Sequence, residues 1–315
     1  MKTTRKHSAF HISRRGFLKL SLGFGVSLLV PGVSVAGEGA SSIIKRRIPK
    51  TGEEIPVIGL GTARTFDVST RKAREPLREV LRLFVEMGGT LVDTSPMYGN
   101  AETVIGDLAD ELGIVDSLFL ATKVWTTGRE AGIRQMEESM RRLKRDHIDL
   151  MQVHNLVDTQ VHLDTLRSWK KEGRIRYLGV THYRVSAYDE LEKIMKTESI
   201  DFVQFNYSIQ TTEAEKRLLP VAADTGTAVI INEPFEKGAL FKKVKGKALP
   251  SWAKEFDCGS WAQFFLKYIV SHPSVTCVIP ATSKPEHLKD NMQAGYGRLP
   301  DERMRKHMVD YLREL

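Results

Sequence analysis

Short apolar strands and amphipathic helices alternate along this chain from about residue 57 onward, and this alternation limits the folds available to it. The expected strands span 57–60, 90–92, 118–122, 148–153, 175–180, 202–205, 227–231 and 275–279. The expected helices span 71–87, 101–112, 129–145, 159–172, 186–196, 212–225 and 260–271, followed by 285–293 and 301–314. Strict alternation implies a parallel sheet, and eight such units in about 240 residues predict an α/β fold of the (β/α)8 barrel (TIM barrel) type.

An open, doubly wound sheet is the alternative to the barrel. That fold normally carries a glycine-rich first turn that binds a pyrophosphate. The corresponding stretch here, Gly59 to Arg64, lacks the third glycine, and no phosphate-binding GxxxxGK[ST] loop occurs. The residues before it, 45–58, alternate around Lys50-Thr51-Gly52-Glu53 and predict a β-hairpin. The barrel with an N-terminal hairpin is therefore the favoured fold.

The formal charge of +8 is concentrated at the N-terminus. Residues 1–36 hold six Lys or Arg and no acidic residue. Removing those six from the 47 basic residues leaves 41 against 39 acidic residues, a net charge of +2. A nearly neutral body lacks the broad basic surface of a nucleic-acid-binding protein, so we expect no nucleic-acid partner.

The basic N-terminus has the order of features found in an export signal. Ser13 to Lys19 (SRRGFLK) resembles the twin-arginine motif, an apolar stretch of 20–35 follows, and Ser34-Val35-Ala36 is a small-residue cleavage site. The apolar stretch is shorter than the roughly 20 residues that span a bilayer, although an uncleaved anchor or a basic tail are the alternatives. We expect a Tat-type signal peptide at 1–36, a linker at 37–44, and a periplasmic domain at 45–315.

The two cysteines, Cys258 and Cys277, are too few for a disulfide framework. Cys277 lies in an apolar strand, where a small buried side chain is expected. No Cys/His spacing indicates a zinc site, and we expect no metal.

Four polar residues with complementary chemistry follow the second, third and fourth predicted strands. Asp93, Lys123 and His154 stand at strand ends, and Tyr98 lies in the loop after Asp93. The C-terminal strand ends of a parallel barrel share one face, where active sites lie. An ammonium group beside a phenol favours the phenolate and lowers the phenol's pKa toward neutrality, which suits proton donation to a carbonyl oxygen. Each residue alone is more often structural, but the joint pattern predicts a carbonyl-reducing site.

The chain resembles the aldo-keto reductase family over about residues 45–295. The resemblance rests on DTSPMYG at 93–99, TK at 122–123 and QVHN at 152–155. It implies that the four polar residues form the family's catalytic tetrad, with Tyr98 as the general acid. It also implies that the hairpin at 45–58 closes the N-terminal end of the barrel.

The resemblance further implies an extended nicotinamide dinucleotide, NADP (NADPH) rather than NAD. The positions that match its binding residues are Thr181, His182, Gln204, Phe235, Gly238, Leu240, Thr282, Ser283, Lys284, His287, Asp290 and Asn291. Two features depart from the family pattern. Asn232 occupies the position of a tyrosine that stacks on the nicotinamide, and Ala281 and His287 replace basic residues around the 2′-phosphate. Lys284 is the remaining cation for that phosphate.

The substrate should enter from the same face of the barrel. Phe66, Met97, Trp125 and Leu156 are candidates for an apolar pocket wall, and each has barrel packing as its alternative. We expect a monomeric enzyme that reduces small-molecule aldehydes or ketones and that engages the twin-arginine export machinery. The alternatives are a cofactor-holding redox sensor or binding module with slow turnover, and a barrel lyase or isomerase.

Overall fold

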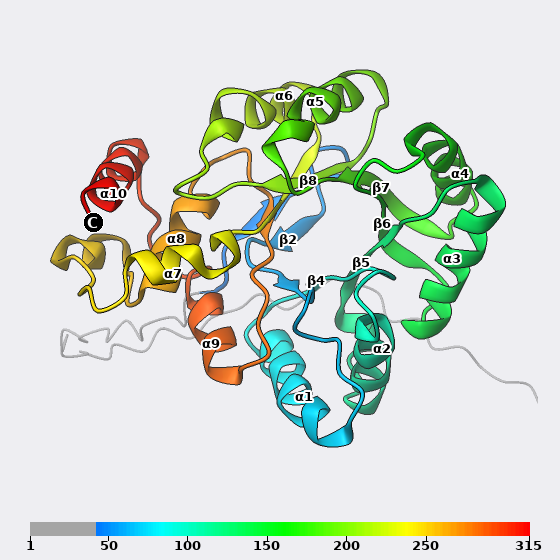
Figure 1. The fold of residues 1–315 in the computed structure, drawn as a ribbon, viewed down its shortest axis with the longest axis horizontal. Helices are drawn as coiled ribbons and strands as arrows, with labels where there is room; N and C mark the ends of the chain where they lie inside the picture. The colour runs from blue at the N-terminus through cyan, green and yellow to red at the C-terminus, as the bar shows by residue number, and fades with distance from the viewer. Residues whose placement is uncertain (1–41) are drawn as a thin grey trace, which may run out of the picture. The chain divides into compact units, whose positions relative to one another are not determined.

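The computed structural model describes residues 42–315, in which eight parallel strands form a barrel surrounded by helices (Figure 1). Neighbouring strands follow one another in chain order. They are β3 (Leu60–Gly61), β4 (Leu91–Asp93), β5 (Phe119–Val124), β6 (Ile148–His154), β7 (Ile175–Thr181), β8 (Phe202–Asn206), β9 (Ala228–Asn232) and β10 (Cys277–Val278). The ring is closed by two parallel bridges, Ile58 to Val278 and Gly61 to Ala281. The prediction of a (β/α)8 barrel is confirmed.

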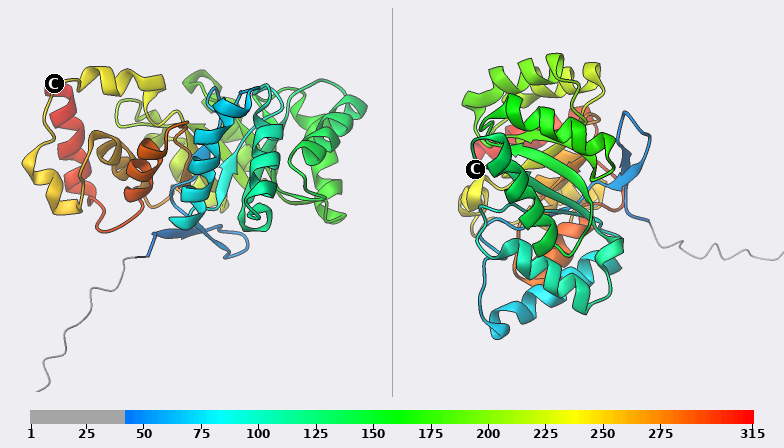
Figure 2. Two further views of the ribbon diagram at one scale, coloured as in Figure 1. Left: turned by 90° about the horizontal axis from the view of Figure 1, so that it is seen from below. Right: turned by 90° about the vertical axis from the view of Figure 1, so that its right-hand side faces the viewer.

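Helices cover the outside of the strands (Figures 1 and 2). They are α1 (Arg71–Glu86), α2 (Ala101–Glu111), α3 (Arg129–Arg142), α4 (Thr159–Lys171), α5 (Tyr188–Thr197), α6 (Leu218–Thr225), α7 (Ala239–Lys243), α8 (Trp261–Val270), α9 (Pro285–Gln293) and α10 (Glu302–Glu314). Helix α1 shows why these segments are helical. Thr70 caps its N-terminus by accepting a hydrogen bond from the Ala73 amide, and Leu77, Val80 and Phe84 repeat at helical spacing on its buried face.

A β-hairpin made of β1 (Lys45–Arg47) and β2 (Glu54–Pro56) precedes the barrel. Ile48 and Ile55 from this hairpin are buried in one apolar cluster with residues of the barrel strands. That cluster includes three rings, whose centroids lie 5.4–6.1 Å apart, from Phe119, Tyr177 and Phe202. The hairpin therefore closes the N-terminal end of the barrel, as the sequence predicted.

In β5, β6 and β8 the inward-facing residues change from apolar to polar toward the C-terminal end of the strand. Successive side chains of a strand alternate between its two faces, so residues two apart point the same way. Phe119 and Ala121 of β5 belong to the apolar interior cluster, whereas Lys123 on the same face is bonded to polar groups. The same change occurs between Leu150 and Gln152 of β6, and between Phe202 and Gln204 of β8. An apolar floor thus supports a polar layer at the C-terminal strand ends.

Two predicted elements differ clearly from the structure, and one observed helix was not predicted. The strand expected at 57–60 is reduced to Leu60–Gly61. Residues 57–59 form only an isolated bridge to the last strand, from Ile58 to Val278, and not a continuous ladder. The helix expected at 212–225 is broken at Arg217, whose φ is −139°. In a continuous helix the ring of Pro220 would clash with the carbonyl of Lys216, which accounts for the break. Helix α7 was not predicted, because five residues are too short to show a helical period.

Both cysteines are free and buried, which confirms the burial expected for Cys277. No helix within residues 42–315 has the length and apolar character needed to cross a membrane. The same residues contain no group of three or more His, Cys, Asp or Glu side chains arranged to hold a metal ion. The predicted signal peptide at 1–36 lies outside the described residues and stays a prediction.

Candidate active site

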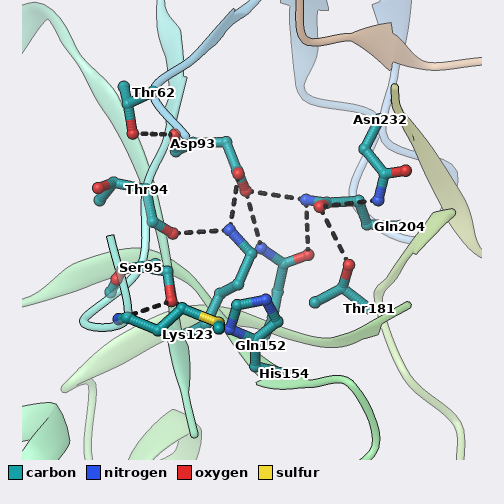
Figure 3. Close-up of polar contacts among 12 residues, drawn as sticks. Thr62, Asp93, Thr94, Ser95, Lys123, Gln152, His154, Thr181, Gln204 and Asn232 are labelled. Carbon is teal, nitrogen blue, oxygen red and sulfur yellow. Dashed lines mark hydrogen bonds and ion pairs between the residues drawn. The ribbon is translucent and has the colours of Figure 1, made fainter. Parts of the chain in front are cut away.

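A fully buried ion pair lies at the centre of the polar layer (Figure 3). The Lys123 ammonium donates to Asp93 Oδ2 at 2.6 Å and to the Thr94 carbonyl at 2.7 Å. The exposed side-chain fractions are 0% for Lys123 and 4% for Asp93. An ammonium has three N–H donors, so the third remains available on the side of Tyr98. Burial lowers the pKa of Lys123, but Asp93 and Tyr98 outweigh it and the pKa is raised, so the ammonium stays charged.

Two glutamine side chains hold the other oxygen of Asp93. Gln204 Nε2 and Gln152 Nε2 donate to Asp93 Oδ1 at 2.8 and 3.2 Å. Gln204 Oε1 accepts from Thr181 Oγ1 at 3.0 Å and from Asn232 Nδ2 at 3.3 Å. Gln204 was predicted only as a nicotinamide contact, yet both ends of its amide are bonded within the protein. The network therefore fixes the carboxylate that holds Lys123.

Tyr98 lies in a turn after β4, in which its amide donates to the Ser95 carbonyl at 3.0 Å. Lys123 Nζ is 5.0 Å from the centroid of its ring. Burial raises the pKa of Tyr98, Lys123 lowers it, and burial prevails. The expectation that Lys123 brings this pKa toward neutrality is wrong for the protein alone, because burial outweighs the effect of the ammonium and the charge of Asp93 offsets part of that effect. Tyr98 is consequently a protonated phenol at neutral pH, the form that a proton donor requires.

His154, the last residue of β6, is 5% exposed and stands edge-on to Tyr98, with ring centroids 5.9 Å apart. Burial lowers its pKa to about 2, helped by the charges of Lys123 and His182. The imidazole is therefore neutral, and one of its nitrogens carries a hydrogen that can be donated to a ligand. Nδ1 lies 3.0 Å from Ser95 Oγ.

The predicted catalytic residues lie beside a cavity of about 750 Å³. Asp93, Tyr98 and His154 line it directly, whereas Lys123 lies behind them. Other predicted residues that line the cavity are Met97, Thr181, Gln204, Phe235 and Gly238. His182 flanks it beside Tyr183, with the two rings stacked at 5.4 Å. The structure thus brings the tetrad together with the expected nicotinamide end of the cofactor site.

Several predicted site residues do not line the cavity. Phe66 and Leu240 are both 0% exposed within the hydrophobic core, so neither can contact a ligand there. Leu156 also packs against that core. Trp125 is 42% exposed and its ring centroid is 6.5 Å from that of His154, which places it beside the cavity rather than in its wall. The predictions for Phe66, Leu156 and Trp125 followed loop position, which does not reveal the side-chain direction, whereas Leu240 was predicted from the resemblance.

The predicted adenosine-phosphate residues lie on the segment after β10 and on α9, outside the cavity lining. They are Thr282, Ser283, Lys284, His287, Asp290 and Asn291. Thr282 Oγ1 accepts from the Lys284 amide at 3.1 Å at the start of α9. Asp290 accepts from Ser260 Oγ at 2.8 Å and Gln263 Nε2 at 2.7 Å, so its carboxylate joins α9 to α8. A structural role for Asp290 accounts for its contacts, and the binding roles of the others stay predictions.

The cavity residues that were not predicted include Arg64, Asn155, Tyr183 and Lys237. Arg64, three residues after β3, has a φ of 64°, and Asn155, directly after β6, has a φ of 52°. Lys237 pairs with Glu233 at 3.1 Å and lies 5.1 Å from the Tyr183 ring centroid. Arg64 follows a strand end in the sequence, a signal that could have identified it. The contact between Lys237 and Tyr183 joins two distant loops and has no local signal.

A comparison with known protein families decides the family of this barrel. The sequence model described as "Aldo/keto reductase family" matches residues 57–308, most of the chain. The chain belongs to the aldo/keto reductase family. The predicted family and the prediction of an oxidoreductase are thereby confirmed.

Curated relatives of this aldo/keto reductase include bacterial enzymes. The aldo-keto reductase YhdN of Bacillus subtilis is 29% identical over 213 residues, which is 62% of this chain and 63% of that protein, less than two thirds of its length. The methylglyoxal reductase YeaE of Escherichia coli is 28% identical over 245 residues, covering 75% of this chain and 84% of that protein.

Solved structures show the same fold. An aldo-keto reductase from Bacillus halodurans in its holo form superposes with a TM-score of 0.70 at 23% identity, covering 86% of this chain and 96% of that one. An aldo/keto reductase from Klebsiella pneumoniae in complex with NADP and acetate gives a TM-score of 0.69 at 24% identity, covering 83% and 93%. At this identity the likeness establishes the barrel.

Proposed function

We propose that this aldo/keto reductase reduces an aldehyde or ketone to the alcohol, with NADPH as the hydride donor and Tyr98 as the proton donor. The observation that carries the proposal is the buried Lys123 ammonium, which is held by Asp93 at 2.6 Å and lies 5.0 Å from the Tyr98 ring centroid beside the cavity. Relatives named as reductases, one of them a methylglyoxal reductase, support carbonyl chemistry.

The tetrad would act on the carbonyl oxygen of the substrate. The phenol of Tyr98 gives its proton as negative charge develops on that oxygen, and Lys123 stabilises the phenolate that remains. Asp93 keeps the ammonium charged and in place. The neutral imidazole of His154 donates an N–H to the same oxygen and orients it. The reduced nicotinamide, when bound, supplies the hydride.

The cavity fits a ligand that carries both hydrogen-bond donors and negative charge. Three residues that line it, Thr65, Asn155 and Asn232, each carry a buried side-chain oxygen that has no hydrogen-bond partner among residues 42–315. A carboxamide or ribose could supply donors to such oxygens. Arg64 and Lys237, which also line the cavity, would hold the phosphates, and Lys284 would contact the 2′-phosphate. Complexes of Klebsiella pneumoniae reductases with NADP and NADPH support this choice of cofactor.

A nucleotide-oxidation assay tests the proposal. Protein lacking residues 1–36 should bind NADPH, seen by fluorescence titration, and should oxidise it when members of a broad aldehyde panel are added. We expect a smaller rate with NADH. Binding of neither nucleotide would favour a lyase or isomerase, and tight binding with very slow turnover for every carbonyl would favour the redox sensor. Either result would contradict the proposed function.

We also propose that the enzyme is exported by the twin-arginine machinery to the periplasm. The support is SRRGFLK at 13–19, followed by an apolar stretch and Ser34-Val35-Ala36. This route carries folded proteins, so a nucleotide could be loaded before crossing. Fractionation of a bacterial host should place the protein in the periplasm, and Arg14→Lys with Arg15→Lys should keep it in the cytoplasm. Cytoplasmic retention of both forms would contradict export.

A further inference from the structure

The Ser95 hydroxyl lies between a backbone amide and the ring of His154. Ser95 is fully buried, two residues beyond the end of β4. The Met97 amide donates to Ser95 Oγ at 3.2 Å, and Ser95 Oγ lies 3.0 Å from His154 Nδ1 (Figure 3). No other partner of this hydroxyl occurs among residues 42–315. The arrangement raises the question of which atom carries the shared hydrogen.

Only one assignment satisfies all three groups. The Met97 amide is necessarily a donor, so Ser95 Oγ is already an acceptor on that side. If the hydroxyl donates to His154 Nδ1, then the amide, the hydroxyl and Nδ1 are each paired. If Nδ1 carries the hydrogen instead, the Ser95 oxygen receives two donors and its own buried O–H has no acceptor. Buried hydroxyls without partners are disfavoured, so the first assignment prevails.

The consequence concerns the opposite edge of the imidazole. A neutral imidazole has one protonated nitrogen, so an accepting Nδ1 requires a hydrogen on Nε2. Because His154 lines the cavity and its pKa is far below neutrality, the Nε2 hydrogen remains over the working pH range. An N–H there attracts a substrate oxygen, whereas a bare nitrogen lone pair would repel it.

We propose that Ser95 is a positioning residue that holds His154 in the Nε2–H tautomer and thereby directs a hydrogen-bond donor at the carbonyl oxygen of the substrate. This inference rests on the proposed function for its catalytic consequence, although the tautomer itself is a property of the free protein. The edge-on contact between Tyr98 and His154 restricts the ring's position but does not distinguish the two nitrogens. Ser95 supplies that distinction.

Nitrogen NMR on protein labelled in its histidines tests the tautomer directly. Nine histidines are present, so His154→Gln identifies the signals that belong to His154. We expect a protonated Nε2 and an unprotonated Nδ1 in the wild type and in Ser95→Thr, which keeps the hydroxyl. Ser95→Ala should shift both signals toward a mixture of tautomers. A protonated Nδ1 in the wild type, or an unchanged spectrum in Ser95→Ala, would overturn the proposal.

Kinetics then tests the consequence with the same variants. Ser95→Ala should lower kcat/KM for an aldehyde about tenfold, which is the effect of one hydrogen bond of this kind, whereas Ser95→Thr should stay within about twofold. Because Ser95 does not line the cavity, the Kd for NADPH should be unchanged in both variants. A raised Kd in Ser95→Ala would indicate a general structural role instead. If neither the wild type nor any variant reduces a carbonyl, the proposed function is wrong. The NMR measurement still tests the tautomer in that case, because it does not depend on activity.

Discussion

Tyr98→Phe is expected to lower kcat for carbonyl reduction by a factor of about 10²–10⁴, the usual contribution of a positioned general acid. The substitution removes one oxygen and keeps the ring that lies 5.0 Å from Lys123 Nζ. The barrel and the cavity should therefore be preserved, and the Kd for NADPH should change little. Single-turnover oxidation of NADPH with an aldehyde measures the effect, with the His154→Gln variant for comparison. Equal rates for Tyr98→Phe and the wild type would remove Tyr98 from the mechanism.

The pH profile provides a further measurement on the same residue. Burial raises the pKa of Tyr98 above its ordinary value near 10, and the donor must be protonated to act. His154, with a pKa of about 2, adds no acidic limb near neutrality. We therefore expect kcat/KM for reduction to be flat between about pH 6 and 9 and to fall at higher pH. The fall should be absent from the residual activity of Tyr98→Phe.

Three of the four tetrad residues were predictable because they are tied to strand ends. In a parallel barrel all C-terminal strand ends share one face, so a polar residue just after an apolar run is placed by the fold itself. Asp93, Lys123 and His154 needed only the strand boundaries, and those were correct to within about two residues. The prediction of these three residues thus required no knowledge of loop structure, whereas Tyr98 lies in the loop after β4.

The pocket walls were harder to predict because loop side chains have no fixed period. Phe66 stands six residues after β3 Leu60 and turns into the core, while Met97 stands four residues after β4 and lines the cavity. Both are apolar and both follow a strand, so sequence position does not separate them. Leu240, which was predicted from the resemblance, is buried by the short helix α7, and that helix was not predicted.

The glutamine network shows a second limit of sequence reasoning. Gln152 and Gln204 lie 52 residues apart, and their contact depends on the relative register of β6, β7 and β8. In β6, Gln152 pairs with Gly179 of β7, while Thr181 of β7 pairs with Gln204. Alternation alone indicates that each glutamine points inward but not that both reach one carboxylate. The pairing explains why Gln204 carries a structural role beside the predicted cofactor role.

Lys123→Met is expected to abolish measurable reduction and to lower the free energy of unfolding by about 3–5 kcal/mol, the usual cost of leaving one partner of a buried ion pair alone. Asp93 would keep its bonds to Gln152 and Gln204, but its Oδ2 would lose the ammonium at 2.6 Å. Methionine has nearly the length of lysine, so little of the loss comes from an empty cavity. Urea unfolding followed by circular dichroism measures the change.

Adding Asp93→Asn to Lys123→Met separates the electrostatic cost from the loss of chemistry. The double variant has no unpaired buried charge, and the asparagine oxygen can still accept from Gln152 and Gln204 at the former Oδ1 position. We expect it to regain most of the stability lost in Lys123→Met while remaining inactive, because the phenolate of Tyr98 still lacks its ammonium. A double variant no more stable than Lys123→Met would show that repacking, rather than the stranded carboxylate, causes the loss. Recovered activity in the double variant would instead show that proton donation by Tyr98 does not need the ammonium of Lys123.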